Sequence, residues 1–126
     1  MIKFTIPFPP ITKKNHQQIR CNRSTGKPFI AQSNQYRDYE NACLLAIQGR
    51  YRINIDYPIN LTALFYMPTQ RRVDLVNLIE ALQDILVAAH VLSDDNCKIV
   101  VSTDGSRVLY DKEHPRTEVI ISEAKV

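Results

Sequence analysis

The stretch Arg71–Asp95, RRVDLVNLIEALQDILVAAHVLSDD, decides the fold. Its apolar residues recur three or four positions apart, the spacing that gathers side chains on one face of an α-helix. Asp74 stands where the helix would begin, and an aspartate there can cap free backbone N–H groups and suits the positive end of the helix dipole. Ser93–Asn96 has turn composition and should end the element. The apolar face comprises Leu75, Leu78, Ile79, Leu82, Ile85, Leu86 and Ala89.

The segments on either side of this helix are mostly strand-like. Alternating apolar residues and flanking Pro or Gly predict seven strands, and a second apolar stripe predicts a second helix that Ser33 could cap. Because strands outnumber helices and several are joined by short turns, we expect an α+β fold in one domain, residues 1–126, with a mixed β-sheet covered by two α-helices. The expected strands are Ile2–Pro7, Gln17–Asn22, Pro28–Ala31, Ile53–Met67, Cys97–Ser102, Arg107–Tyr110 and Thr117–Ser122. The second helix is Asn34–Gln48, with Tyr36, Tyr39, Ala42, Leu45 and Ala46 as its stripe.

Length and composition narrow the class of protein. With 126 residues and 44% hydrophobic composition, the chain is large enough for one packed core. No apolar run approaches the length of a membrane span, and the first residues lack a secretory cleavage pattern. Three scattered cysteines without a CxxC pair fit a reducing compartment. We therefore expect no membrane partner and a cytoplasmic location.

The net charge of +3 is modest, but its distribution is uneven. Seven cations precede Asp38, the first acid of the chain. A cationic stretch without carboxylates is typical of a surface for a polyanion, and the alternative is a solvated face balanced by acids elsewhere. The seven cations are Lys3, Lys13, Lys14, Arg20, Arg23, Lys27 and Arg37.

Carboxylates at the two ends of the long helix are the first candidates for chemistry. Asp74 and the pair Asp94 and Asp95 would lie about 30 Å apart across a straight helix, so they meet only if the chain folds back or the helix is shorter. Carboxylates that do meet would favour Mg²⁺ or Mn²⁺, and Arg71 and Arg72 beside them could hold a phosphodiester. The alternative is an ordinary helix cap, a turn and a solvated loop.

Other kinds of catalytic site find little support. His16, His90 and His114 lack zinc-type spacing, and no serine stands in a GxSxG elbow. The glycines Gly26 and Gly105 stand alone and form no phosphate-binding loop.

Three motifs in order along the chain resemble the RusA family of Holliday-junction resolvases. They are Pro7–Pro10 (PFPP), Arg71–Leu78 (RRVDLVNL) and Val91–Asp95 (VLSDD). The segments Gly105–Arg107 and Asp111–Glu118 are similar to a phage and prophage branch of that family. The resemblance implies a small homodimeric endonuclease that uses Mg²⁺, with Mn²⁺ possible, binds branched DNA at four-way junctions and nicks two opposing strands symmetrically.

Carried over by position, the resemblance assigns the metal ligands to Asp74 and Asp95, with Asp94 as a further candidate. Two departures stand out. The second aspartate of the family motif is Val76 here, and a position that is often lysine is Glu80. Because helical side chains lean toward the N-terminus, Glu80 could reach the place of the missing carboxylate one turn earlier. We hypothesise that Glu80 replaces it, with Asp84 a weaker candidate, and the alternative is that both are solvated helix-face acids.

The sequence therefore predicts a metal-dependent endonuclease that resolves Holliday junctions. Val76 also suggests an alternative, an architectural protein that has kept junction binding and lost catalysis. A hydrolase of small phosphate esters is a third reading, which the basic N-terminal stretch disfavours. The expected phosphate contacts are Arg71, Arg72, Lys13 and Lys14, with Arg20, Arg107 and Arg116 behind them.

Overall fold

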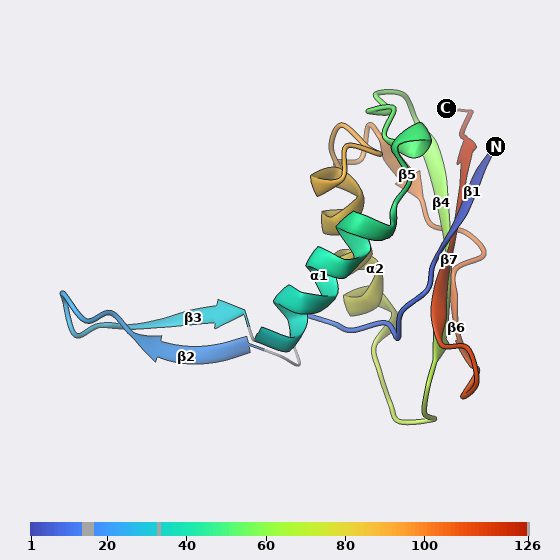
Figure 1. Cartoon of the computed structure of the whole chain (residues 1–126). Helices are drawn as coiled ribbons and strands as arrows, with labels where there is room; N and C mark the ends of the chain where they lie inside the picture. The colour runs from blue at the N-terminus through green and yellow to red at the C-terminus, as the bar shows by residue number, and fades with distance from the viewer. Residues whose placement is uncertain (14–16, 33, 126) are drawn as a thin grey trace.

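The computed structural model describes residues 1–13, 17–32 and 34–125, without the side chains of residues 17–20 and 29–32. A five-stranded mixed sheet forms the body, two helices cover one of its faces, and a separate β-hairpin projects to one side (Figure 1). The predicted α+β fold is confirmed. The body strands are β1 (Ile2–Ile6), β4 (Ile59–Met67), β5 (Val100–Ser102), β6 (Arg107–Tyr110) and β7 (Arg116–Glu123). The other elements are β2 (Gln17–Cys21), β3 (Pro28–Gln32), α1 (Asn34–Ala46), the 3₁₀ helix η2 (Gly49–Tyr51) and α2 (Leu75–Ala88).

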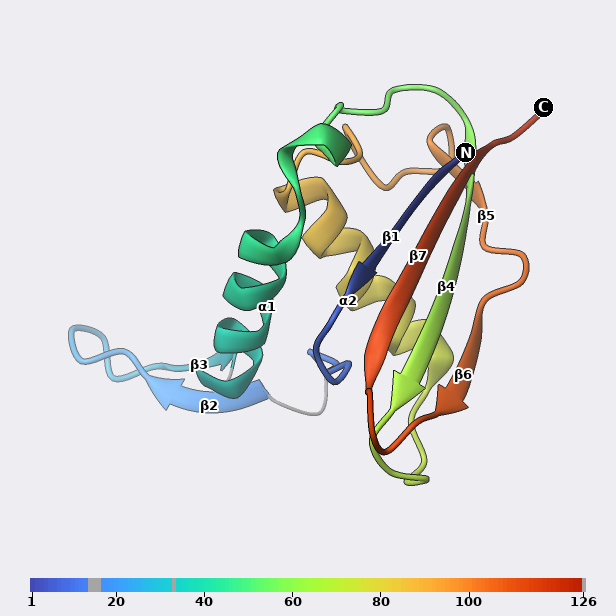
Figure 2. The same ribbon diagram turned by 45° about the vertical axis from the view of Figure 1, so that its right-hand side comes forward.

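The sheet is mixed because β4 has an antiparallel neighbour on one side and parallel neighbours on the other. β7 lies between β1 and β4 and runs antiparallel to both, while β5 and β6 pair with β4 in parallel. Alternate residues of β4 and β7 are buried, as a sheet with one covered face requires. β1, β4 and β6 all end at the same end of the sheet, next to the start of α2 (Figure 2).

The long helix packs its apolar face on the sheet, as its sequence predicts. Five of the seven predicted stripe residues are buried, and Leu75 and Ile79 pack partly buried against the core. Ala81 is also buried, because α2 contacts α1 as well as the sheet and so buries a wider face. The buried stripe residues are Leu78, Leu82, Ile85, Leu86 and Ala89.

The residues that α1 buries differ in part from the predicted apolar stripe. Tyr36 and Tyr39 are buried as expected, but Leu45 is 87% exposed, and Cys43 is buried instead. Successive helical residues turn by about 100°, so Leu45 lies roughly opposite Cys43. The helix ends at Ala46 rather than Gln48, and Gly49 begins η2. The expected cap, Ser33, lies outside the described residues.

Two predicted strands are shorter than expected. Ile53 is half-exposed and β4 begins only at Ile59, after Pro58. β5 begins at Val100 because the carbonyl of Asn96 accepts the Val100 N–H at 2.9 Å in a turn. Gly105 bends the chain between β5 and β6 with φ of +88°, a conformation that favours glycine.

The predicted hairpin is present and pairs only with itself in the described structure. β2 and β3 form a two-stranded antiparallel sheet, and Gly26 at its tip has φ of +68° (Figures 1 and 2). The tip is closed by hydrogen bonds between Asn22 and Lys27 and between Asn22 and Gly26. In the described part of the chain, no helix has the length and apolarity needed to cross a bilayer.

Candidate active site

Asp74 occupies the N-cap position of α2 but does not cap the helix with its side chain. The residue is exposed, its backbone is extended with φ −87° and ψ 122°, and among the described residues no backbone N–H of the helix donates to its carboxylate. Instead Asn77 Nδ2 donates to Asp74 Oδ2 at 3.3 Å. The carboxylate is therefore oriented by an amide and remains open to solvent.

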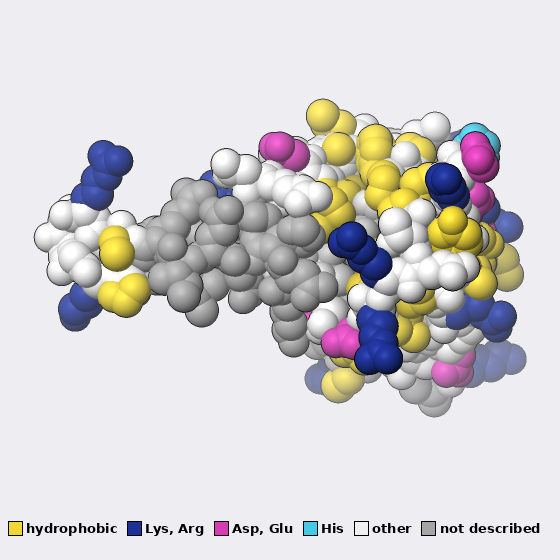
Figure 3. All heavy atoms as spheres, turned by 90° about the horizontal axis from the view of Figure 1, so that it is seen from below, with side chains coloured by type: hydrophobic (Ala, Val, Ile, Leu, Met, Phe, Trp, Pro, Cys, Tyr) yellow, Lys and Arg dark blue, Asp and Glu magenta, His cyan; other side chains and the backbone are white. Residues whose placement is uncertain are grey.

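Two exposed arginines precede Asp74 in the connection from β4 to α2. Arg71 and Arg72 are both exposed, and the backbone N–H of Arg71 points to Thr69 Oγ1 at 3.5 Å. Seen from this end, the body shows several Lys and Arg side chains among apolar ones, and the hairpin tip carries further cations (Figure 3). The connection from β4 to α2 therefore presents two exposed cations within three positions of Asp74 in the chain.

Asp94 forms the turn that follows α2. Its Oδ1 accepts the backbone N–H of Asp95 at 2.7 Å, and its Oδ2 accepts Asn96 Nδ2 at 3.0 Å. The Asp95 N–H, with Asn96 behind it, lowers the pKa of Asp94. Both carboxylate oxygens are thus engaged, and Asp94 has the local role of a turn residue.

Asp95 has a different environment. Partial desolvation, a side-chain contact with Asp94 and the negative charge of Asp84 raise its pKa. Asp84 comes from the second half of α2, so the chain after the helix folds back along it. Hydrogen bonds from Val91 and Leu92 to the Leu86 carbonyl hold that return.

Asp84 is also paired with a cation from the segment after β1. The Lys13 ammonium forms an ion pair and hydrogen bond with Asp84 Oδ2, and both side chains are half-buried. Asp84 was only a weaker candidate in the sequence, and its contact with Lys13 crosses 71 positions of chain. No short-range pattern could have revealed this contact.

The carboxylates predicted as ligands do not converge within one chain. Asp74 and Asp84 are separated by about 15 Å of helix axis, and Asp95 lies near Asp84. α2 begins at one end of the body and ends toward the other (Figures 1 and 2). Within residues 1–13, 17–32 and 34–125, no three His, Cys, Asp or Glu residues are close enough to hold a metal ion. Glu80 is exposed on the same helix, and its role as a ligand stays a prediction.

The remaining predicted phosphate contacts differ in how available their side chains are to a ligand. Arg107 is exposed on β6, whereas Arg116 is held by Asp111 at 2.9 Å and Glu118 at 3.2 Å. Its guanidinium also lies 3.8 Å from the Tyr66 ring centre, so Arg116 stabilises the sheet end and has few donors left for DNA. Lys14 lies outside the described residues, and the side chain of Arg20 is not described.

The sequence matches a protein-family model over most of its length. The model described as endodeoxyribonuclease RusA matches residues 7–122 of the 126-residue chain. The chain belongs to the RusA endodeoxyribonuclease family. No curated protein sequence matches the chain closely enough to count as a relative.

Membership of the RusA family gives the site its chemical class. The family consists of endonucleases of Holliday junctions, which connects this chain with branched DNA and recombination. The match spans the segment after β1, the hairpin, both helices and all but the last residue of β7, so it includes every candidate residue named above.

Proposed function

We propose that this RusA-family chain is a structure-selective endodeoxyribonuclease that resolves four-way DNA junctions by paired, symmetric nicks during recombination, repair or phage DNA processing. The observation that carries the proposal is the Asp74 carboxylate, which is exposed, unused for capping and follows Arg71 and Arg72 after one intervening residue, Val73. A carboxylate on a segment that also presents two arginines suits a phosphodiester, because the cations can bind phosphate oxygens while the carboxylate serves the hydrolytic step.

Mg²⁺ is the cofactor that this chemistry favours, with Mn²⁺ as a substitute. Carboxylate oxygens are the ligands that these ions prefer, and a bound ion would activate water and stabilise charge on the phosphate. The described residues of one chain do not fit such an ion, because Asp74 and Asp95 stand near opposite ends of α2. A complete site therefore needs ligands from elsewhere.

A second copy of the chain would supply the missing ligands. A two-fold axis that sets two α2 helices antiparallel brings Asp74 of each chain toward Asp95 of the other, and creates two identical sites. Two matched sites are also what a junction requires for two matched nicks. Val76, which is 73% exposed in the first turn of α2, would then be covered by the partner.

The basic N-terminal stretch supports DNA as the partner. Its described tip residues Arg23 and Lys27 are exposed on the projecting hairpin, and Arg107 is exposed on β6. Lys13, Lys14 and Arg20 stay as predicted contacts, and Lys13 would exchange Asp84 for phosphate. Contacts of this kind give affinity and position rather than base sequence, and they weaken steeply with salt. Exposed Cys21 and Cys97, both free, suit a reducing cytoplasm.

A second function is favoured by the same exposed Val76. A valine cannot bind a metal ion, so the chain would be a junction-binding architectural protein with weakened catalysis unless Glu80 supplies the carboxylate. Under this reading the cations matter for function and the carboxylates do not.

The substitutions Asp74→Asn and Asp95→Asn separate the two functions. The nuclease proposal expects each to abolish nicking of a labelled four-way junction while binding in a gel-shift assay stays within about twofold of the parent. Asparagine is also a good N-cap residue, so Asp74→Asn should leave α2 intact. A parent protein that binds junctions tightly but nicks none with Mg²⁺ or Mn²⁺ would establish the architectural function instead.

A further inference from the structure

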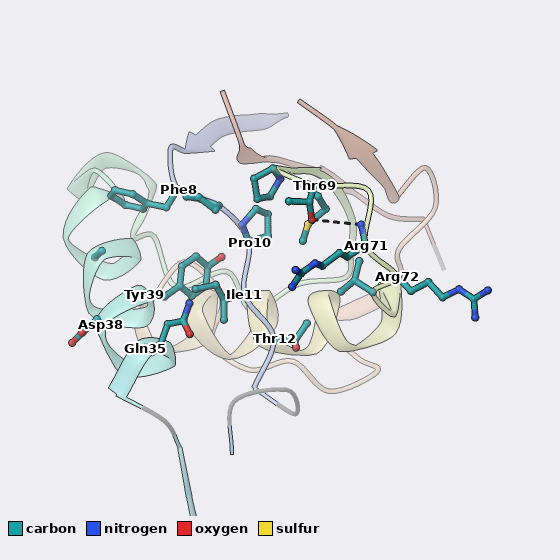
Figure 4. Close-up of a pocket in the computed structure, with 15 residues that line it drawn as sticks. Phe8, Pro10, Ile11, Thr12, Gln35, Asp38, Tyr39, Thr69, Arg71 and Arg72 are labelled. Carbon is teal, nitrogen blue, oxygen red and sulfur yellow. Dashed lines mark hydrogen bonds between the residues drawn. The ribbon is translucent and has the colours of Figure 1, made fainter. Parts of the chain in front are cut away.

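A cavity of about 600 Å³ opens beside the start of α2, and no role has been assigned above to the cavity itself. Three segments far apart in sequence form its walls (Figure 4). The segment after β1 contributes Phe8, Pro10 and Ile11, and α1 contributes Gln35, Tyr39 and Ala42. The end of β4 contributes Met67, and the connection that follows it contributes Arg71 and Val73. Its volume falls within the range of small-ligand pockets, about 300–1,000 Å³.

The walls combine apolar and aromatic surface with one cation. Phe8 and Tyr39 bring rings to the cavity, and the Arg71 side chain points into it, whereas Arg72 points away (Figure 4). Asp38 is the one acid among the described lining residues, and its carboxylate is directed outward. No ion pair to Arg71 is present in the described part of the chain. An arginine that enters a mainly apolar cavity without a carboxylate suits an anionic ligand that also has a flat apolar part.

The cavity adjoins the proposed cleavage site. Val73 lines it, and Asp74 follows directly in the chain. A strand whose phosphate reached Asp74 would run close to the residues that line the cavity. The nucleotide next to that phosphate is the group placed to enter.

We propose that this cavity receives one unstacked base of a junction strand, with Arg71 on the phosphate of the same or the adjacent nucleotide. The inference rests on the proposed junction-nuclease function and adds a base-binding site to it. Rings and guanidinium planes bind bases by stacking, and bases at a branch point cost less to unstack than those inside a duplex. A base held here would set which phosphodiester bond stands at Asp74, and so where the strand is cut.

An apolar side chain of a protein partner is the competing occupant. Such a side chain would use the rings of the cavity but would leave Arg71 without an anion inside it. Arg71 in the cavity and Arg72 beside it therefore favour a nucleotide.

The test couples a change in the cavity to a change in the DNA. Ala42 is half-buried on α1 and lines the cavity, so Ala42→Phe fills the space, and Ala42→Leu is a milder filler if the phenylalanine prevents folding. Asn41→Phe, on the exposed neighbour outside the cavity, is the matched control. Binding is measured in EDTA, so that the result does not depend on a metal ion, with a set of four-way junctions that each lack one base near the branch.

We expect the parent and Asn41→Phe to bind one of these abasic junctions about tenfold more weakly than the intact junction, because base stacking is lost. The Ala42 variants should bind intact and abasic junctions alike. Arg71→Gln should weaken binding to all of them. If no abasic position weakens the parent, or if the filled variants keep the same tenfold dependence, the cavity does not bind a base. A parent that binds no junction at all would instead contradict the proposed function, a distinct result.

Discussion

Asn77 donates a hydrogen bond to Asp74 across the first turn of α2, with Nδ2 and Oδ2 3.3 Å apart. The donor sits on the same helix three residues later, so the helix itself fixes the direction of the carboxylate. One carboxylate oxygen is thereby held, and the other remains available to a ligand. This relationship makes Asn77 a positioning residue for Asp74.

Removal of this amide should reduce nicking without unfolding the helix. We expect Asn77→Ala to lower the nicking rate about tenfold, the usual effect of losing a group that orients a metal ligand. Junction binding and the midpoint of thermal unfolding should stay near the parent values, because the bond is exposed. Gln83→Ala on the same helix is the control. Nicking by Asn77→Ala at the parent rate would show that Asp74 needs no orienting partner.

A site shared between two chains predicts complementation on mixing. Asp74→Asn and Asp95→Asn proteins should each be inactive, and a mixed dimer should regain one active site, because one chain keeps Asp95 and the other keeps Asp74. The measurement is nicking after the two variants are unfolded, mixed and refolded together. The regained activity should nick one strand per junction. If the mixture stays inactive while the mixed parent controls recover, each site is built within one chain.

A carboxylate introduced at position 76 should be able to replace the carboxylate of Glu80. We expect Glu80→Gln to slow nicking and to raise the Mg²⁺ concentration needed for half-maximal rate. Val76→Asp in that background should restore the rate, because it returns a carboxylate to the family's motif position one turn before residue 80. A parent-like rate for Glu80→Gln alone would end the replacement hypothesis.

The Lys13–Asp84 ion pair should stabilise the fold modestly. Both side chains are half-buried, and the pair joins the segment after β1 to α2. We expect a coupling energy of about 0.5–1 kcal/mol from urea unfolding of Lys13→Ala, Asp84→Ala and the double variant. Strictly additive effects of the two single changes would show that the pair contributes no coupling.

The ion pair between Arg116 and Asp111 should make part of the folding stability depend on pH in the acid range. The His114 backbone N–H, with Arg116 next, lowers the pKa of Asp111. Since the folded pKa lies below the unfolded value of about 3.9, this stabilisation is full above that value and is lost as the pH falls through the folded pKa. Arg116→Ala should raise the Asp111 pKa in an NMR titration and lower the thermal midpoint more at pH 7 than in strong acid. An equal loss at both pH values would contradict this origin.

The elements with a clear period were predictable from sequence. The apolar spacing of α2 and the alternation in β4 and β7 each reflect one buried face, so local sequence contains the necessary information. The stripe of α1 was less clear because Leu45 and Cys43 are both apolar, and only the position of the sheet decides which is buried.

The candidate residues of the site were recognised from the sequence, but their arrangement in space was not. Asp74, Arg71 and Arg72 were recognised from a short motif, and their exposure fits the expectation. The Lys13–Asp84 contact and the cavity behind Arg71 depend on segments that meet only in the folded chain. The separation of Asp74 from Asp95 depends on where α2 ends and how the following turn returns, which spacing alone could only bound.

Nicking of a defined junction tests the central claim most directly. The purified protein is incubated with an end-labelled four-way junction and with linear duplex of the same sequence, in Mg²⁺, Mn²⁺ or EDTA. We predict paired nicks at symmetric positions on the junction alone, and none in EDTA. Tight, salt-sensitive binding of the junction without nicks in either metal would contradict the nuclease function and leave junction binding as the activity of this chain.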